Sequence, residues 1–281
     1  MTKSPLYICR KYTLNLSDKT LIMGILNVTP DSFSDGGKFL SKDSAVKQAL
    51  RMATEGADII DVGGESTRPG APAISAKEEL KRVIPVIRAL AGKVKLPVSI
   101  DTYKSEVAEA ALSEGASIVN DISGFRFDKK IAGVAARYKA GVVLMHILGV
   151  PGNMQQNPGY ENLIKEISLY LKKSALIARR AGVAKESIIL DPGIGFGKTL
   201  EHNLLLIKKI GEFRKLGYPV LMGPSRKSFI GKLLGLPAEE RLEGTLAAVA
   251  ACVLNGASAV RVHDVKETAR VVKIAGAIKK A

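Results

Sequence analysis

The feature that most restricts the fold is a regular alternation, repeated eight times, of a short apolar run with a longer amphipathic segment. Short runs rich in β-branched residues that alternate with helical patterns indicate βαβ units and a parallel sheet. The runs are apolar on both faces, which is typical of strands that are covered on both sides. We predict strands at residues 21–28, 57–64, 97–102, 117–121, 141–146, 187–192, 219–223 and 259–263. We predict helices at residues 42–55, 76–90, 105–114, 129–139, 160–181, 200–216, 238–254 and 265–278.

Eight evenly distributed units favour a closed barrel over an open doubly wound sheet. Three helix-to-strand junctions nearly repeat one another, namely EGADIID at 55–61, EGASIVN at 114–120 and NGASAVR at 255–261. The glycine of each junction can adopt the left-handed conformation that ends a helix. No Pro/Gly/Ser-rich linker divides the chain. The sequence therefore predicts one (β/α)₈ (TIM) barrel of α/β class over residues 21–281, with residues 1–20 as an N-terminal hairpin that closes its bottom.

The chain is strongly basic, with 42 Lys and Arg against 27 Asp and Glu and a formal charge of +15. Such a balance can serve a nucleic acid, a membrane surface or small acidic ligands. The basic residues are spread along the helical segments, so we interpret them as solvated helix faces and expect no nucleic-acid partner. We see no signal peptide or apolar run of 18 residues, and the two cysteines form no C-x-x-C pair. These observations predict a cytoplasmic protein with no membrane partner.

Polar side chains recur at the predicted strand exits, which in such barrels form the active-site mouth. Any one of them alone could be a turn former or a cap, but together they predict a polar pocket. Carboxylate and amide groups suit a flat, donor-rich heterocycle, while cations suit phosphate. The first group is Asp101, Asn120 and Asp191, and the second is Lys227, Arg261 and Arg68.

Two long Gly/Pro/Ser-rich connections follow the first two strands, at residues 29–37 and 66–72. Such loops can act as lids over a reactive intermediate, although ordinary surface turns are the simpler interpretation. The run GIGFGKT at 193–199 is not a phosphate-binding P-loop, because Pro192 stands where that motif requires glycine. The three histidines have no spacing typical of a zinc site.

Two long runs, MGILNVTPDSFSDGG at 23–37 and DIIDVGGESTRPGA at 58–71, resemble signatures of the dihydropteroate synthase family. The similarity continues in order through SIDTYK (99–104), VNDISG (119–124), LMH (144–146) with PGNMQ (151–155), LDPGIGFGKT (190–199), GPSRKSFIG (223–231) and RVHD (261–264). The resemblance implies a transferase of folate biosynthesis that condenses a dihydropterin methyl diphosphate with p-aminobenzoate (4-aminobenzoate) and releases diphosphate. It further implies Mg²⁺, a homodimer and competition by sulfonamides.

The resemblance also implies roles for individual residues. Catalytic roles fall to Asp101, Lys227 and Arg261. Pterin binding falls to Asp101, Asn120, Met145, Asp191, Phe196, Gly223 and Lys227. Diphosphate binding falls to Asn27, Arg68, Arg261 and His263, with Asn27 also a ligand of Mg²⁺. The p-aminobenzoate site falls to Phe33, Thr67, Arg68, Pro69, Lys227 and Ser228. We expect a dissociative, SN1-like substitution in which Asp101 stabilises a cation and Lys227 orients the substrates. The stretch from Met145 to Gly149 departs from the family pattern, which affects only that wall of the pocket.

Two alternatives remain at this stage. A pterin-binding methyltransferase of the same barrel superfamily would need no diphosphate cluster, so residues 225–227 and the loop at 67–70 weigh against it. A non-catalytic RNA-binding barrel is favoured only by the charge of +15, without aromatic stacking runs.

Overall fold

The structure is a computed structural model that describes residues 6–17, 19–29 and 38–281, the first four residues of the last range by their backbone alone. Eight parallel strands follow one another round a barrel, as predicted. They are β3 (Leu21–Asn27), β4 (Ile59–Gly63), β5 (Val98–Asp101), β6 (Ile118–Asp121), β7 (Gly141–Met145), β8 (Ile188–Asp191), β9 (Leu221–Met222) and β10 (Ala259–Val262). Strand β10 pairs with both β3 and β9, and a bridge between Leu190 and Val220 joins β8 to the start of β9. The sheet is thereby closed.

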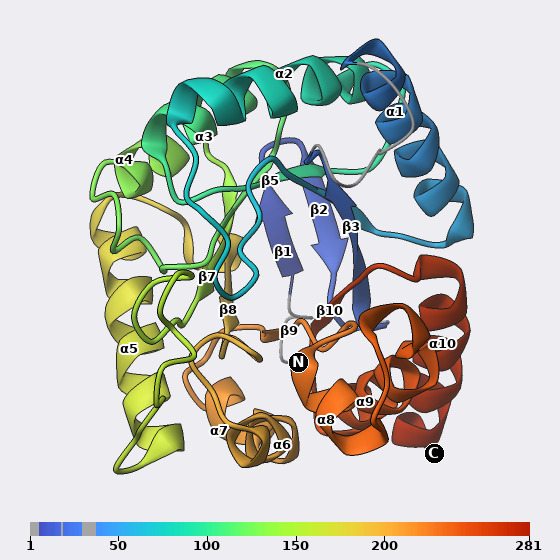
Figure 1. Cartoon of the computed structure of the whole chain (residues 1–281). Helices are drawn as coiled ribbons and strands as arrows, with labels where there is room; N and C mark the ends of the chain where they lie inside the picture. Colours follow the sequence, from blue (N-terminus) through green and yellow to red (C-terminus); the bar gives the residue numbers. More distant parts are fainter. Residues whose placement is uncertain (1–5, 18, 30–37) are drawn as a thin grey trace.

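Helices surround the barrel in chain order, so that the last helix lies beside the first (Figure 1). They are α1 (Lys38–Glu55), α2 (Ala76–Ala91), α3 (Ser105–Ser113), α4 (Ile131–Arg137), α5 (Leu163–Arg180), α6 (Leu200–Lys208), α7 (Ile210–Arg214), α8 (Ser228–Leu234), α9 (Leu242–Leu254) and α10 (Val265–Lys280). The three repeated junctions behave as predicted, because Gly56, Gly115 and Gly256 have φ values of +107°, +112° and +103°.

Two predicted helices differ in detail. The predicted helix at 200–216 is divided into α6 and α7 at Lys209, and the Asn255 side chain donates a hydrogen bond to Ile207 O at the break. The short helix α8 was not predicted, and the helix expected from residue 238 begins with a 3₁₀ turn before α9 starts at Leu242. In both places short helical segments replace a single long one.

Alternate residues of each strand face two different cores. Ile22 and Leu26 of β3 pack outwards into the layer between strands and helices, whereas Met23 points into the barrel. The lower interior is sealed by the antiparallel hairpin β1 (Leu6–Cys9) and β2 (Tyr12–Asn15), whose Tyr7 is fully buried. The predicted hairpin thus closes the bottom, and the opposite end of the barrel is left for a site.

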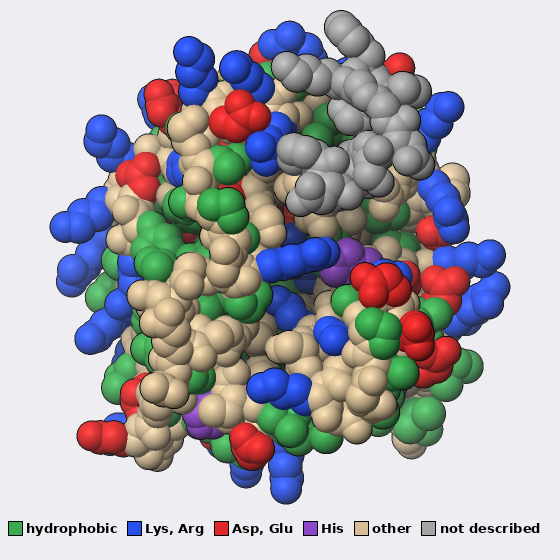
Figure 2. Space-filling model, viewed as in Figure 1, with side chains coloured by type: hydrophobic (Ala, Val, Ile, Leu, Met, Phe, Trp, Pro, Cys, Tyr) green, Lys and Arg blue, Asp and Glu red, His purple; other side chains and the backbone are tan. Residues whose placement is uncertain are grey.

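Basic side chains stand out singly around the edge of the molecule, and a few more lie round a central hollow (Figure 2). On this face the basic side chains form no continuous stripe among the described residues. Among the described residues, no helix combines the length and apolar character that crossing a membrane requires.

Candidate active site

A cluster of charges occupies the mouth of the barrel, where β4, β5, β6 and β10 end. Arg261 donates from Nε to Asp61 Oδ2 and from Nη2 to Asp101 Oδ2, both at 2.6 Å. Asn120 Nδ2 donates to the same Asp61 oxygen at 3.0 Å. Parallel pairing explains the convergence, because Asp101 lies opposite both Gly63 and Asn120. One guanidinium therefore serves two carboxylates, and the cluster carries a net negative charge when both are ionised.

The electrostatics of this cluster follow from its burial. Burial raises the pKa of Asp101 to about 7, Arg261 opposes this shift, and the negative charge of Asp61 adds to it. Burial lowers and the two carboxylates raise the pKa of Arg261, which stays a cation. Asp61 is fully buried, and its Oδ1 has no hydrogen-bond partner among the described residues. A buried acceptor without a partner costs free energy, and this oxygen is inaccessible to a ligand in the mouth.

A second group lies across the mouth, at the ends of β8 and β9. Asp191 Oδ1 accepts a hydrogen bond from Gly193 N at 2.7 Å, and burial raises the pKa of Asp191 to about 6. The Lys227 ammonium lies 4.2 Å from the centre of the Phe196 ring, within cation–π range. Burial and the neighbouring Arg261 lower the pKa of Lys227 to about 8. A carboxylate and an ammonium thus lie at the same mouth, and both interact electrostatically with Arg261.

An apolar wall stands beside these polar groups. Met145 and Phe196 are buried in one cluster with Ile122, Ile147 and Met154. An apolar wall with polar groups at its edge is typical of pockets for flat aromatic ligands. In such pockets apolar side chains contact the faces of the ligand rings, and a few polar groups form hydrogen bonds with the edge of the rings. Ile147, in the stretch after Met145 that departs from the family pattern, belongs to this wall.

Several predicted anion ligands also reach the mouth. The Ser225 hydroxyl contacts His263 Nδ1 at 2.9 Å and accepts a hydrogen bond from His263 N at 3.2 Å. Burial lowers the pKa of His263 to about 3, so the ring is neutral without a ligand. A Cβ atom added to Gly63 would lie 3.8 Å from Asn27 Oδ1 and 3.7 Å from Asp101 Oδ2, so both oxygens flank this glycine.

The remaining predicted site residues make fewer contacts with the charged groups of the mouth. Thr67 is half-buried, and Arg68, Pro69 and Ser228 are exposed; Ser228 is the first residue of α8. No side-chain hydrogen bond or ion pair connects Arg68 with the other described residues of the mouth. Gly223 lies at the end of β9, where an added Cβ would be 3.9 Å from that of Arg261. Phe33 falls outside the described residues.

Similarity to known proteins identifies the chain. A family model described as pterin binding enzyme matches residues 23–263. The chain is 52% identical over 261 residues to dihydropteroate synthase of Synechocystis sp., which covers 92% of this chain and 90% of that protein. It is 51% identical over 265 residues to dihydropteroate synthase of Bacillus subtilis, with 94% and 90% covered. The chain belongs to the dihydropteroate synthases of the pterin-binding enzyme family.

Solved structures of the family agree with this assignment. Dihydropteroate synthase of Yersinia pestis, described with a sulfonamide drug, has a TM-score of 0.92 and 43% identity and covers 98% of this chain and 100% of its own. The enzyme of Xanthomonas albilineans with 4-aminobenzoic acid has a TM-score of 0.92 and 42% identity, with 99% and 100% covered. The chain is accordingly a transferase, and the synthase interpretation holds over the methyltransferase.

Two sets of site residues were not singled out from the sequence of this synthase. Asp61 received no role from the sequence, although it accepts hydrogen bonds from both Arg261 and Asn120. Lys198 is buried, contacts His146 Nδ1 at 3.1 Å and donates to Phe196 O at 2.7 Å. Burial lowers the pKa of Lys198 to about 7 and that of His146 to about 2. A lysine directly after GFG was the available signal, since lysine is seldom buried without a partner.

Proposed function

We propose that the mouth binds a dihydropterin methyl diphosphate and p-aminobenzoate and joins them through an SN1-like substitution. The observation that carries this proposal is the Asp61–Arg261–Asp101 cluster, which sets a cation against two carboxylates beside an apolar wall. A cation stabilises the negative charge of a leaving diphosphate, and a carboxylate stabilises a carbon that becomes positive. The mouth of the barrel contains both kinds of group.

The pterin is assigned to the slot between the apolar wall and the far polar edge. Met145 and Phe196 supply a surface for the flat rings, and Gly223 leaves room beside Arg261. Asp191 accepts from the amino and ring N–H groups of the pterin, and Asn120 both donates and accepts. Lys227 donates to a pterin acceptor from its place over Phe196.

The diphosphate is assigned to Arg261, His263 and Asn27, with Arg68 reaching it from its exposed loop. No cluster of three acidic, histidine or cysteine side chains for a metal exists among the described residues. This fits Mg²⁺ better than zinc, because Mg²⁺ keeps several waters and uses one or two protein oxygens with substrate phosphates. Asn27 Oδ1, beside Asp101 Oδ2 at Gly63, is the oxygen we assign to it. Mg²⁺ would neutralise charge that develops on the leaving diphosphate.

The reaction then proceeds in two bond changes. The bond between the methylene carbon and the diphosphate oxygen breaks, and the electron pair leaves with the diphosphate. The methylene becomes a cation conjugated to the dihydropterin, and the Asp101 carboxylate stabilises it. The lone pair of the aniline nitrogen attacks this carbon to form the new C–N bond, and the nitrogen loses a proton to solvent or to the released diphosphate.

The second substrate is assigned to the loop after β4. Thr67, Arg68 and Pro69 lie on it, and Ser228 lies across the mouth at the start of α8. The N–H groups at a helix start and a cation both suit the carboxylate of p-aminobenzoate. Lys227 directly precedes Ser228, so it lies between the two substrates and orients both. Phe33 keeps its assignment to this site.

A homodimer is the proposed assembly. Helices α9 and α10 expose Leu254, Ile274 and Ile278, the last two with more than 60% of their surface accessible. A second apolar groove between α8 and α9 exposes Leu233 and Leu234. Contiguous exposed apolar surface of this kind favours a partner, and a second copy related by a two-fold axis is the commonest one. Ile274→Glu should shift the mass measured by light scattering from dimer to monomer.

A reducing, cytoplasmic location is also proposed. Cys9 and Cys252 are both buried free thiols, and burial raises their pKa values, which keeps them as unreactive thiols.

The substitution is tested with Asp101→Asn, which keeps the size of the side chain. The purified variant should still bind the pterin substrate within about tenfold of the wild-type affinity, because Asp191 and Asn120 remain. It should lose at least about a hundredfold in kcat, measured as dihydropteroate formed, because the developing cation loses its carboxylate. Unchanged turnover would remove Asp101 from the proposed mechanism.

A further inference from the structure

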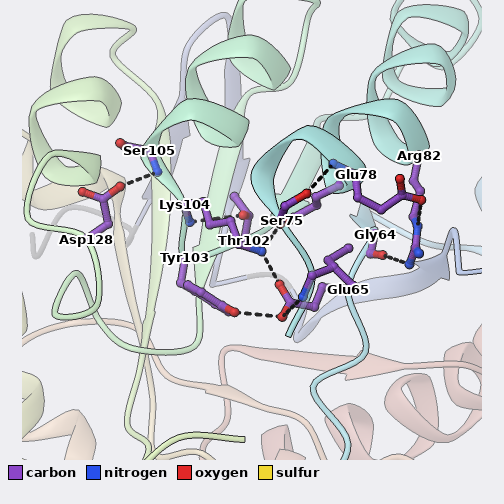
Figure 3. A network of polar contacts seen from close by, with 12 residues as sticks. Gly64, Glu65, Ser75, Glu78, Arg82, Thr102, Tyr103, Lys104, Ser105 and Asp128 are labelled. Atoms are coloured by element: carbon purple, nitrogen blue, oxygen red, sulfur yellow. Dashed lines mark hydrogen bonds and ion pairs between the residues drawn. The ribbon is translucent and has the colours of Figure 1, made fainter. Parts of the chain in front are cut away.

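Glu65 is a buried carboxylate that none of the roles above uses. It directly follows Gly64 at the end of β4, and its side chain is only 8% exposed. Its Oε1 accepts a hydrogen bond from the Tyr103 hydroxyl at 2.8 Å and a longer one from Ile74 N at 3.4 Å. Its Oε2 accepts from the Lys104 ammonium. One side chain therefore connects the beginning of the loop, the end of the loop and the segment after β5 (Figure 3).

Both ends of this loop are fixed to helix α2. A Cβ atom at Gly64 would lie 2.6 Å from Val83 Cγ1, so the backbone packs directly on the helix. Arg82 Nη1 donates to Gly64 O at 3.0 Å. At the other end, the Ser75 hydroxyl accepts from Glu78 N and caps the helix. The loop between residues 65 and 75 is thus a closed unit whose ends Glu65 bridges.

Lys104 is shared between two carboxylates. Its ammonium donates to Glu79 Oε2 at 2.6 Å as well as to Glu65, and the Glu79 side chain is 1% exposed. Burial raises the pKa of Glu79, while Lys104 and Thr102 lower it. Buried charges are stable only when they stay paired, so this lysine holds its place and is not available to a substrate.

The same contacts join the loop to the strand that carries Asp101. Thr102, Tyr103 and Lys104 follow Asp101 without interruption, and Thr102 N donates to Asn120 O at 3.0 Å. The Tyr103 ring packs edge-on against Phe127, with 5.5 Å between the ring centres. The position of the loop relative to Asp101 is therefore set through Glu65 by two neighbours on one rigid segment.

We propose that Glu65 is a positioning residue for the second substrate, acting with Lys104 and Tyr103. It fixes residues 66–73, which carry Thr67 to Pro69, at the distance from Asp101 that the incoming aniline nitrogen needs. This inference rests on the proposed assignment of that loop to p-aminobenzoate. Glu65 makes no contact with the pterin-slot residues named above, whereas Tyr103 packs against the apolar wall and Arg68 of the same loop is assigned to the diphosphate. Loss of Glu65 should therefore raise the KM for p-aminobenzoate far more than the KM for the pterin substrate.

Two variants test the positioning role. Glu65→Gln removes the charge and leaves Lys104 paired with Glu79, so the variant should fold. It should raise the KM for p-aminobenzoate about tenfold, the effect of one lost charge-assisted hydrogen bond, and leave the KM for the pterin substrate within about twofold. Tyr103→Phe removes only the hydroxyl and should raise the same KM by about threefold. Glu114→Gln, which breaks the exposed pair with Arg88 at the other end of the barrel, is the matched control and should leave both KM values unchanged.

The alternatives give different results. A uniform fall in kcat with both KM values unchanged would show a merely structural role and overturn the proposal, as would wild-type kinetics in Glu65→Gln. Hydrogen exchange supplies a readout that needs no turnover: amides at 66–73 should exchange about tenfold faster in Glu65→Gln than in wild type or the control, and unchanged exchange would overturn the positioning role. Absence of turnover in the wild-type enzyme would instead count against the proposed function, which keeps the two failures distinct.

Discussion

Replacement of Arg261 by methionine should destabilise the fold strongly, because this side chain is the cation that contacts both Asp61 and Asp101. The two contacts are 2.6 Å each, the Asp61 side chain is inaccessible to solvent, and the Arg261 side chain is 21% exposed. Breaking a buried ion pair by removing one partner typically costs about 3–5 kcal/mol. We expect a loss in this range in the free energy of unfolding at pH 8.

The loss should depend on pH in a defined direction. The folded-state pKa of Asp101 is raised to about 7, above its unfolded value near 3.9, so the folded state binds more protons in this window. Stability contributed by this group therefore falls as the pH rises from about 4 to 7. Arg261 lowers the pKa of Asp101, so its removal should raise that pKa further. The pH range over which the folded state loses this stability then extends above pH 7, and the variant should lose more stability at pH 8 than at pH 5.

Urea unfolding followed by circular dichroism at the two pH values measures both quantities. Arg88→Met is the control, because Arg88 pairs with Glu114 on the surface and little change is expected there. The reasoning is refuted if Arg261→Met costs less than about 1 kcal/mol at pH 8, or if the cost is the same at both pH values.

Three further outcomes are expected. Gly193→Ala should lower the free energy of unfolding by more than about 2 kcal/mol, because Gly193 has φ +74° and an added Cβ would clash with His146 O. Gly133→Ala is the matched control in helix α4, where the space is open, and it should raise the free energy of unfolding by about 0.5–1 kcal/mol. Urea unfolding of the two variants measures both changes. Ionised Asp101 is needed for the reaction, so kcat/KM should fall about tenfold per pH unit below pH about 7, and a pH profile without this limb would contradict the assignment. Sulfonamides should raise the KM for p-aminobenzoate without lowering kcat, and inhibition that p-aminobenzoate does not relieve would place them elsewhere.

The strands of the barrel could be predicted because their signal is local. The run Ile59–Gly63 is buried at every position, and the glycine before it ends a helix, so a few neighbouring residues define both ends. Helix α8 has only seven residues and ends at Gly235 in the left-handed conformation, which is too short for a helical period to stand out. The break at Lys209 depends on Asn255, a residue distant in sequence, and could not be read locally.

The sequence names candidate site residues, but it does not show the contacts between them. The strand exits name Asp101, Asn120 and Asp191, but the sequence does not show that Arg261 reaches across 200 residues to Asp61. The contacts of Glu65 and Lys104 could not be predicted from the sequence either, because they require the end of the loop, helix α2 and the segment after β5 to meet. Pairings of this kind come from closure of the barrel, which places distant strand ends next to one another.

The most direct test of the central claim is diphosphate release by the purified chain with dihydropterin methyl diphosphate and Mg²⁺, measured with and without p-aminobenzoate. The account predicts release that p-aminobenzoate stimulates, with dihydropteroate formed in equal amount. Binding of the pterin without stimulated release, or no binding, would contradict it.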